Sequence, residues 1–196
     1  MKKILLTVVI ALTATIAQAQ TREKGSFELT PQIGYSSANY NGDGVNLDNK
    51  PVNAVSYGLG GDYYFNNRWS LRSGLLFQTM GTKSGLGIFK DELQYSTIPV
   101  NANWHFGSTR KWNLNFGPSI GFLTSANTNG IDIKELVNST QIGFNYGIGY
   151  KIEVSEKVGI LIDWQGMAGL SDITKESSTD LKNVYSAFNA GCVFKL

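Results

Sequence analysis

The chain has 196 residues, of which 42% are hydrophobic, and its formal net charge is +2. Its single cysteine, Cys192, excludes an intramolecular disulfide, so the fold does not depend on disulfide bonds. Two of the 17 basic residues and none of the 15 acidic residues lie within residues 1–19, so the chain without that segment has a formal net charge of zero. A neutral chain argues against nucleic acid as a partner.

The N-terminus has the pattern of a secretory signal peptide. Two lysines precede an apolar run over residues 4–16, and Ala17-Gln18-Ala19 matches a cleavage site. The run is shorter than the roughly 20 residues of a membrane helix, and no later run approaches that length. We therefore predict a signal peptide over residues 1–19 and one mature domain over residues 20–196.

Beyond the signal peptide, apolar and polar side chains alternate with a period of two, which is typical of β-strands with one apolar face. In the sixth such segment, for example, Ile142, Phe144 and Tyr146 alternate with Gly143 and Asn145. In chain order, the alternation predicts strands over residues 26–37, 53–65, 69–81, 93–106, 112–124, 140–154, 158–170 and 184–196.

Two of these strands carry local irregularities. Pro31 in the first strand has no amide hydrogen to donate to a neighbouring strand, which predicts a bulge. In the fourth strand, Leu93 and Tyr95 are apolar residues at positions of the polar parity, which predicts a second bulge near its start.

The connections between the strands are alternately short and long. Outer-membrane barrels have short turns in the periplasm and long loops outside the cell, with an even number of strands. We therefore predict an all-β fold, an eight-stranded antiparallel up-and-down transmembrane β-barrel. A soluble secreted barrel or sandwich is the alternative, but the small Gly, Ser and Asn residues of the polar parity suit a narrow lumen. The short turns are residues 66–68, 107–111 and 155–157, and the long loops are residues 38–52, 82–92, 125–139 and 171–183.

Aromatic residues flank the first two short turns. Phe65 and Trp69 lie on either side of the first, and Phe106 and Trp112 on either side of the second. Aromatic rings favour the level of the lipid headgroups. We predict that these four residues form an aromatic girdle at the periplasmic membrane surface.

Five ionisable residues fall on the parity that faces the lumen: Glu28, Asp62, Arg72, Lys151 and Asp163. A symmetric first turn would pair Phe65 with Trp69 and would place Asp62 directly opposite Arg72. An eight-stranded barrel is narrow enough for side chains to fill it, so buried charges must pair. We predict a structural charge network in the lumen; the alternative is a gate or a narrow ion path based on a switchable ion pair.

The sequence offers little for catalysis or metal binding. His105 is the only histidine, and it faces the lumen near the predicted periplasmic end, whereas an enzyme acting on outer-leaflet lipid needs its catalytic group at the other end. No second histidine is present to build a metal site, and Cys192 lies on the lipid-facing parity. We predict no catalytic residue, no metal site and no cofactor.

The chain resembles the PorT-like outer-membrane β-barrel family of Bacteroidetes in the signal ending Ala17-Gln18-Ala19, the eight strands, the segment Ile98-Pro99-Val100 and the final residues 191–196, Gly-Cys-Val-Phe-Lys-Leu. Its architecture is also similar to OmpX and to the OmpA membrane domain. The resemblance implies location in the bacterial outer membrane, contact with outer-membrane lipid, and assembly by the barrel-assembly machinery.

Fold alone does not fix function. We predict a non-enzymatic barrel whose extracellular loops bind a ligand, mediate adhesion or support envelope structure, because loops on a rigid scaffold are where recognition usually lies. The alternative is a small pore or a secretion-associated barrel.

Overall fold

The structure is a computed structural model that describes residues 22–42, 48–176 and 180–196, so the predicted signal peptide lies outside the described residues. Within them, eight long strands form the wall of a barrel. These are β1 (Phe27–Gly42), β2 (Asn49–Asn66), β3 (Trp69–Met80), β5 (Asp91–Phe106), β6 (Trp112–Thr128), β8 (Thr140–Glu153), β9 (Val158–Gly169) and β10 (Leu181–Lys195). The short elements are β4 (Thr82–Ser84), β7 (Ile131–Asp132) and the 3-10 turn η2 (Lys134–Leu136). The described residues contain no helix of the length and apolarity that crossing a membrane requires.

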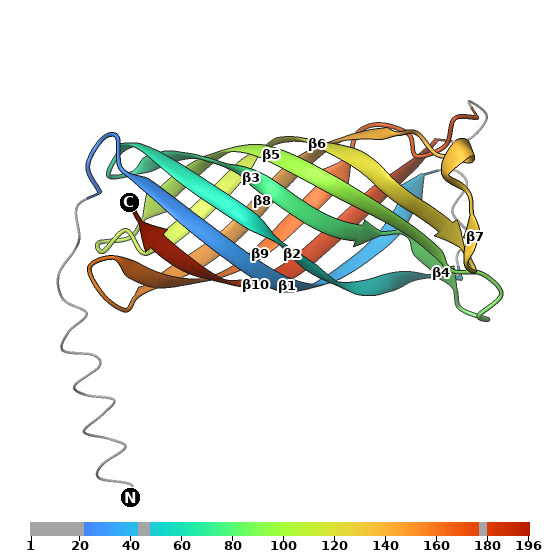
Figure 1. Cartoon of the computed structure of the whole chain (residues 1–196), viewed down its shortest axis with the longest axis horizontal. Helices are drawn as coiled ribbons and strands as arrows, with labels where there is room; N and C mark the ends of the chain where they lie inside the picture. The colour runs from blue at the N-terminus through green and yellow to red at the C-terminus, as the bar shows by residue number, and fades with distance from the viewer. Residues whose placement is uncertain (1–21, 43–47, 177–179) are drawn as a thin grey trace, which may run out of the picture.

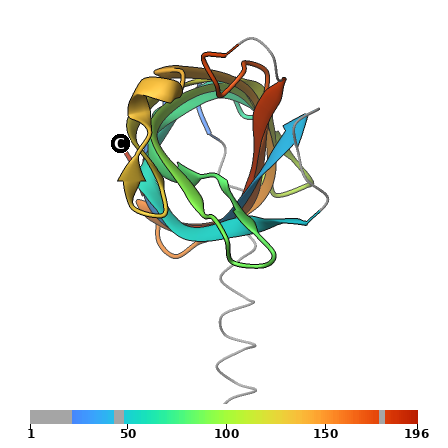
Figure 2. The same ribbon diagram turned by 90° about the vertical axis from the view of Figure 1, so that its right-hand side faces the viewer.

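Each long strand pairs antiparallel with the next long strand along the chain, and β1 pairs with both β2 and β10, which closes the sheet. Figure 1 shows the short turns and the C-terminus at one end of the tube, which we call the short-turn end, and β4 and β7 at the other, the long-loop end. Seen from the long-loop end, the strands form a ring (Figure 2). The predicted eight-stranded antiparallel up-and-down barrel is confirmed.

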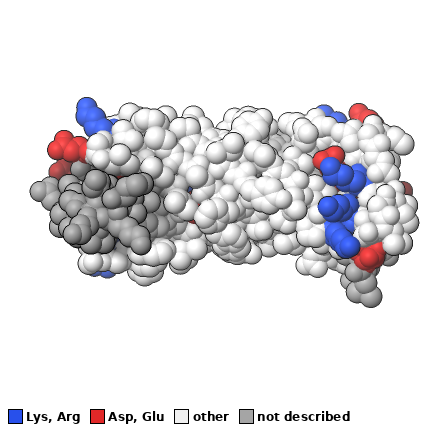
Figure 3. All heavy atoms as spheres, turned by 90° about the horizontal axis from the view of Figure 1, so that it is seen from below, with Lys and Arg blue, Asp and Glu red and all other residues white. Residues whose placement is uncertain are grey.

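The outer surface of the barrel is apolar, and much of its interior is polar. In β8, Ile142 and Phe144 are 51% and 42% exposed, whereas Gln141 and Asn145 are buried. On the face shown in Figure 3, charged side chains gather at the two ends and leave the middle of the visible surface without charge. An apolar band between two charged ends is the surface that a barrel presents to a bilayer.

The strands reach further at the long-loop end than the sequence predicts. β1 continues to Gly42 instead of residue 37, β2 begins at Asn49 instead of residue 53, and β6 continues to Thr128 instead of residue 124. The predicted long loops are therefore partly strand. The alternation detects only the part of a strand that has one apolar face, whereas the backbone ladder continues beyond the apolar band through residues such as Asn39 and Asn41.

The bulge predicted at Pro31 is absent, whereas a register shift does lie where the second bulge was predicted, between Gln94 and Tyr95. The pairing of β1 with β2 runs through Pro31 without a shift of register. In β5, Leu93 and Tyr95 keep the inward phase of the strand, and the irregularity lies in β6, where Thr124 is the extra residue opposite Gln94 and Tyr95. Leu93 and Tyr95 differ from the polar residues at the other inward positions of β5 because the interior of the barrel becomes apolar at this level.

The first short turn is asymmetric. Asn66, not Phe65, pairs with Trp69, because the Asn66 side-chain oxygen accepts hydrogen bonds from the backbone N–H groups of Arg68 (2.8 Å) and Trp69 (3.1 Å). The register shift is confined to the last residues of β2, so Asp62 still lies directly opposite Arg72.

Candidate functional site

The interior at the short-turn end is organised around one carboxylate, that of Glu28 in β1. Lys151 in β8 donates a hydrogen bond to Glu28, as does the Tyr64 hydroxyl (2.8 Å). The Arg22 side chain reaches in from the segment before β1 and places its Nε 3.3 Å from Glu28 Oε1. Its guanidinium also lies 5.3 Å from the centre of the Tyr64 ring. All four side chains are buried, so the carboxylate has two cations as partners in place of water.

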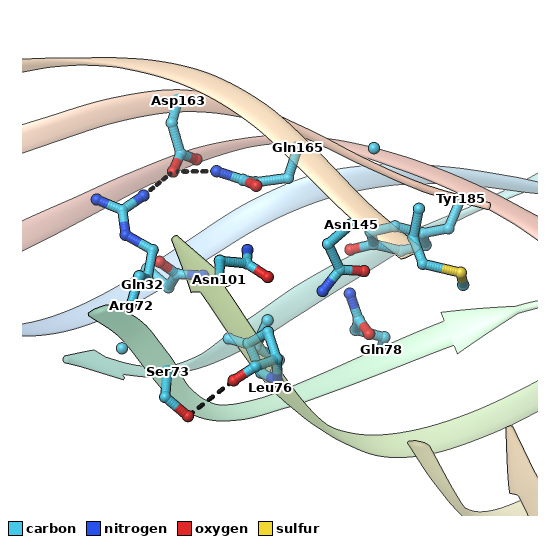
Figure 4. Close-up of a pocket in the computed structure, with 14 residues that line it drawn as sticks. Gln32, Arg72, Ser73, Leu76, Gln78, Asn101, Asn145, Asp163, Gln165 and Tyr185 are labelled. Carbon is cyan, nitrogen blue, oxygen red and sulfur yellow. Dashed lines mark hydrogen bonds and ion pairs between the residues drawn. The ribbon is translucent and has the colours of Figure 1, made fainter. Parts of the chain in front are cut away.

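Further along the interior, Arg72 in β3 holds two carboxylates. Its Nη2 lies 3.1 Å from Asp62 Oδ2 in β2, and its Nη1 lies 3.4 Å from Asp163 Oδ2 in β9. In the closed sheet β9 lies four strands from β3 in either direction, so the Arg72–Asp163 contact crosses the lumen. Asp163 also accepts hydrogen bonds from Gln165 (2.8 Å) and Asn189 (2.9 Å). Figure 4 shows Arg72 and Gln165 converging on Asp163.

The structure therefore brings the five predicted lumen residues into two groups. Glu28 meets Lys151 in one, and Arg72 bridges Asp62 and Asp163 in the other. Arg22, which completes the first group, was missed because it precedes the first strand, where alternation carries no signal.

A serine, a histidine and an aspartate meet beside the second group. The Ser70 hydroxyl lies 2.8 Å from Asp62 Oδ1 and 2.9 Å from His105 Nε2. In a hydrolytic triad the carboxylate orients the histidine and the histidine activates the serine. Here the carboxylate contacts the serine instead, and the three residues are at most 2% exposed. The arrangement is that of a packed polar core, and His105 also lies against the Tyr64 ring, with 4.9 Å between ring centres.

Towards the long-loop end the interior becomes apolar. Met80, Leu93 and Tyr95 are at most 2% exposed there, and Val137 and Ile173, from the segments around η2 and before β10, pack onto them. We call the cluster of buried apolar side chains to which these residues belong the apolar cap. It was not predicted from the sequence, although the inward-facing positions of Leu93 and Tyr95 indicated an apolar interior. A cavity of about 50 Å³ lies between the cap and the charge network, and it is lined by residues of both, including Arg72 and Tyr185 (Figure 4).

The four predicted girdle residues lie on the outer surface at the short-turn end. Trp112 is 45% exposed and Trp69 is 40% exposed. Three of them, Trp69, Phe106 and Trp112, form a run of neighbouring rings with Trp104 and Tyr150: the centres of Phe106 and Trp112 lie 6.2 Å apart, and those of Trp112 and Tyr150 4.9 Å apart. Phe65 is also exposed and contacts the ring of Tyr63.

At the long-loop end, apolar side chains are exposed on a hairpin that hydrogen bonds hold to a neighbouring turn. Leu86 is 79% exposed and Ile88 70% exposed in the hairpin that joins β4 to β5. The Asn129 side chain accepts a hydrogen bond from the Lys90 N–H (2.9 Å) and donates one to the Ile88 carbonyl (3.0 Å), which ties this hairpin to the turn before β7. Among the described residues, no group of three or more His, Cys, Asp and Glu side chains is arranged to hold a metal ion.

Comparison with known proteins identifies a matching protein family and solved structures with a similar fold. The sequence matches the outer membrane protein beta-barrel domain family over residues 5–195. Neisserial surface protein A has a similar crystal structure (TM-score 0.57, 13% identity, covering 87% of this chain and 97% of that one). The outer membrane protein AlkL, solved in DMPC lipid bilayers, is also similar (TM-score 0.53, 10% identity, covering 92% and 94%). Curated proteins gave no significant sequence match.

Proposed function

The chain belongs to the outer membrane protein beta-barrel domain family, and from that premise we propose that it is a closed, non-enzymatic barrel that acts through its extracellular loops. The long-loop end then faces the outside of the cell and the short-turn end faces the periplasm. The loops bind a ligand, mediate adhesion or support envelope structure.

The observation that carries this proposal is the filling of the lumen at two levels. Ion pairs span the interior from β1 to β8 and from β3 to β9, and the apolar cap occupies the interior nearer the long loops. A small pore, or a secretion-associated barrel that passes a chain through its lumen, would require a water path past both. The cavity of about 50 Å³ between these two levels has room for only a few water molecules.

The same proposal includes the signal peptide, the route of membrane insertion and the aromatic girdle. Residues 1–19 are a cleavable signal peptide, the barrel-assembly machinery inserts the chain, and the girdle of Phe65, Trp69, Phe106 and Trp112 lies at the periplasmic membrane surface. The resemblance of the segment Ile98-Pro99-Val100 and of residues 191–196 to the PorT-like family supports a source among the Bacteroidetes.

The test of the proposed function is to shorten the loops of the barrel and leave its wall intact. In one variant, residues 85–89 and 130–136 are replaced by short Asn-Gly turns. In a control variant, the exposed residues 155–157 of a periplasmic turn are replaced in the same way. Cells that lack the native protein receive one of these chains or the whole chain. We expect the loop-shortened barrel to insert normally but to lose the cell attachment or the detergent resistance that the whole chain and the control variant restore. If the loop-shortened barrel restores both properties fully, the proposed role of the loops is wrong.

A further inference from the structure

Three lysines lie side by side across neighbouring strands at the long-loop end. Lys50 in β2 is directly opposite Lys83 in β4, and Lys83 is directly opposite Lys90, the residue before β5. We call these three residues the lysine row. Like charges that face each other across a sheet destabilise it, so this register is unfavourable unless an anion lies between them.

The described part of the protein supplies little counter-charge to the lysine row. Lys90 forms an ion pair with Glu92 (2.7 Å), but both side chains are more than 40% exposed, where such pairs contribute little. Among the described residues, Lys50 and Lys83 form no ion pair. The nearby carboxylate of Asp48 lies against Gly85 instead. Within the part of the chain that the structure describes, no carboxylate therefore forms an ion pair with Lys50 or Lys83.

The same hairpin carries an apolar tip. The Ser84 N–H donates to the Phe89 carbonyl (2.9 Å), which closes the hairpin, and Leu86 and Ile88 project from it into solvent. Seen from the long-loop end, this hairpin leans outward beyond the ring of strands (Figure 2). In a barrel that spans a bilayer, it therefore overhangs the surrounding lipid. Ammonium groups beside apolar side chains are complementary to an amphiphile with an anionic headgroup.

The distance of the lysine row from the apolar band of the barrel agrees with an anionic lipid headgroup as its partner. On β2 the exposed apolar residues end at Val55, Asn53 is the first polar residue on that face, and Lys50 lies five residues beyond Val55. At roughly 3.3 Å per residue and a strand tilt near 40°, that separation is about 13 Å along the membrane normal. Lysine side chains bend back towards the membrane surface from such positions, so their ammonium groups reach the headgroup layer.

We propose that the lysine row binds phosphate groups of lipid headgroups in the outer leaflet, with Leu86 and Ile88 in contact with the same lipid layer. This inference rests on the outer-membrane placement in the proposed function, but it does not depend on a closed lumen. It assigns a binding site to the hairpin that joins β4 to β5, and phosphorylated lipid as its ligand class.

The test compares the whole chain with the Lys50→Gln/Lys83→Gln variant in phosphatidylcholine vesicles, with and without phosphatidic acid. The control variant is Lys24→Gln/Lys157→Gln, which removes two exposed lysines at the short-turn end. We expect phosphatidic acid to stabilise the whole chain and the control variant by about thirtyfold more in the unfolding equilibrium constant than it stabilises the Lys50/Lys83 variant. In phosphatidylcholine alone, the Lys50/Lys83 variant should be at least as stable as the whole chain, because a repulsion has been removed.

Three outcomes would overturn the inference. Phosphatidic acid could stabilise the Lys50/Lys83 variant as much as the whole chain, or the control variant could lose the effect equally, which would indicate general surface charge. Alternatively, free inorganic phosphate in the buffer could reproduce the effect without phosphatidic acid, which would make the site one for small anions. A barrel that conducts ions but retains the lipid effect would contradict the closed lumen of the proposed function and would leave the lysine row as assigned.

Discussion

An Arg72→Met variant is expected to lose about 3–5 kcal/mol of unfolding free energy, because removing one partner of a buried ion pair leaves a buried charge without compensation. Here two carboxylates, Asp62 and Asp163, lose their shared cation, and both are at most 3% exposed. Urea unfolding of the purified chain in lipid vesicles, followed by tryptophan fluorescence, measures the loss.

Removing the charges of the partners should reverse much of this loss. The Arg72→Met/Asp62→Asn/Asp163→Asn variant should be more stable than Arg72→Met alone, since no unpaired carboxylate then remains in the lumen. The matched control is Asp180→Asn, which breaks the exposed ion pair with Lys182 and should change stability little. Independent, additive effects of the three lumen substitutions would show that these residues do not act as one network.

The Lys151→Met variant is expected to have the second-largest effect, a loss of about 3 kcal/mol. Lys151 is 1% exposed, and it donates hydrogen bonds to Glu28 and to the Tyr64 hydroxyl (3.1 Å). The loss should be smaller than for Arg72→Met, because Glu28 keeps Arg22 as a partner. The same unfolding measurement gives the ranking.

Two further variants separate the charge effect of Lys151 from packing. Adding Glu28→Gln to Lys151→Met should recover part of the stability, whereas adding Arg22→Gln to Lys151→Met should reduce it further, because Glu28 then has no cation in contact. If Arg22→Gln has no effect in either background, the segment before β1 does not contribute to the network as the contact geometry indicates.

The lumen network shows how far alternation can be used for prediction. The period of two assigns Asp62 and Arg72 to the same face of neighbouring strands, and the short turn between them fixes their register closely enough to place them opposite each other. The contact of Arg72 with Asp163 could not be predicted in this way. It joins opposite walls of the barrel, and which residues meet there depends on the stagger and tilt of the closed sheet, which no local pattern encodes.

The apolar cap was missed for a different physical reason. A strand of a membrane barrel is expected to be polar on its lumen side, so apolar residues at inward positions of β5 resemble a change of phase. The interior is polar near the short turns but apolar near the long loops, and Leu93 and Tyr95 contribute to that apolar region without leaving the inward face. A pattern that assigns one polarity to each face cannot detect a change along the barrel axis.

The most direct test of a closed lumen is the conductance of the purified chain, inserted into a planar lipid bilayer. The ion pairs of Arg72 and Lys151 and the apolar cap predict a silent barrel, with no stable current steps across the range of voltages that the bilayer tolerates. Stable openings of constant size that substitutions at Arg72 or Lys151 alter would contradict the closed lumen and would favour the pore.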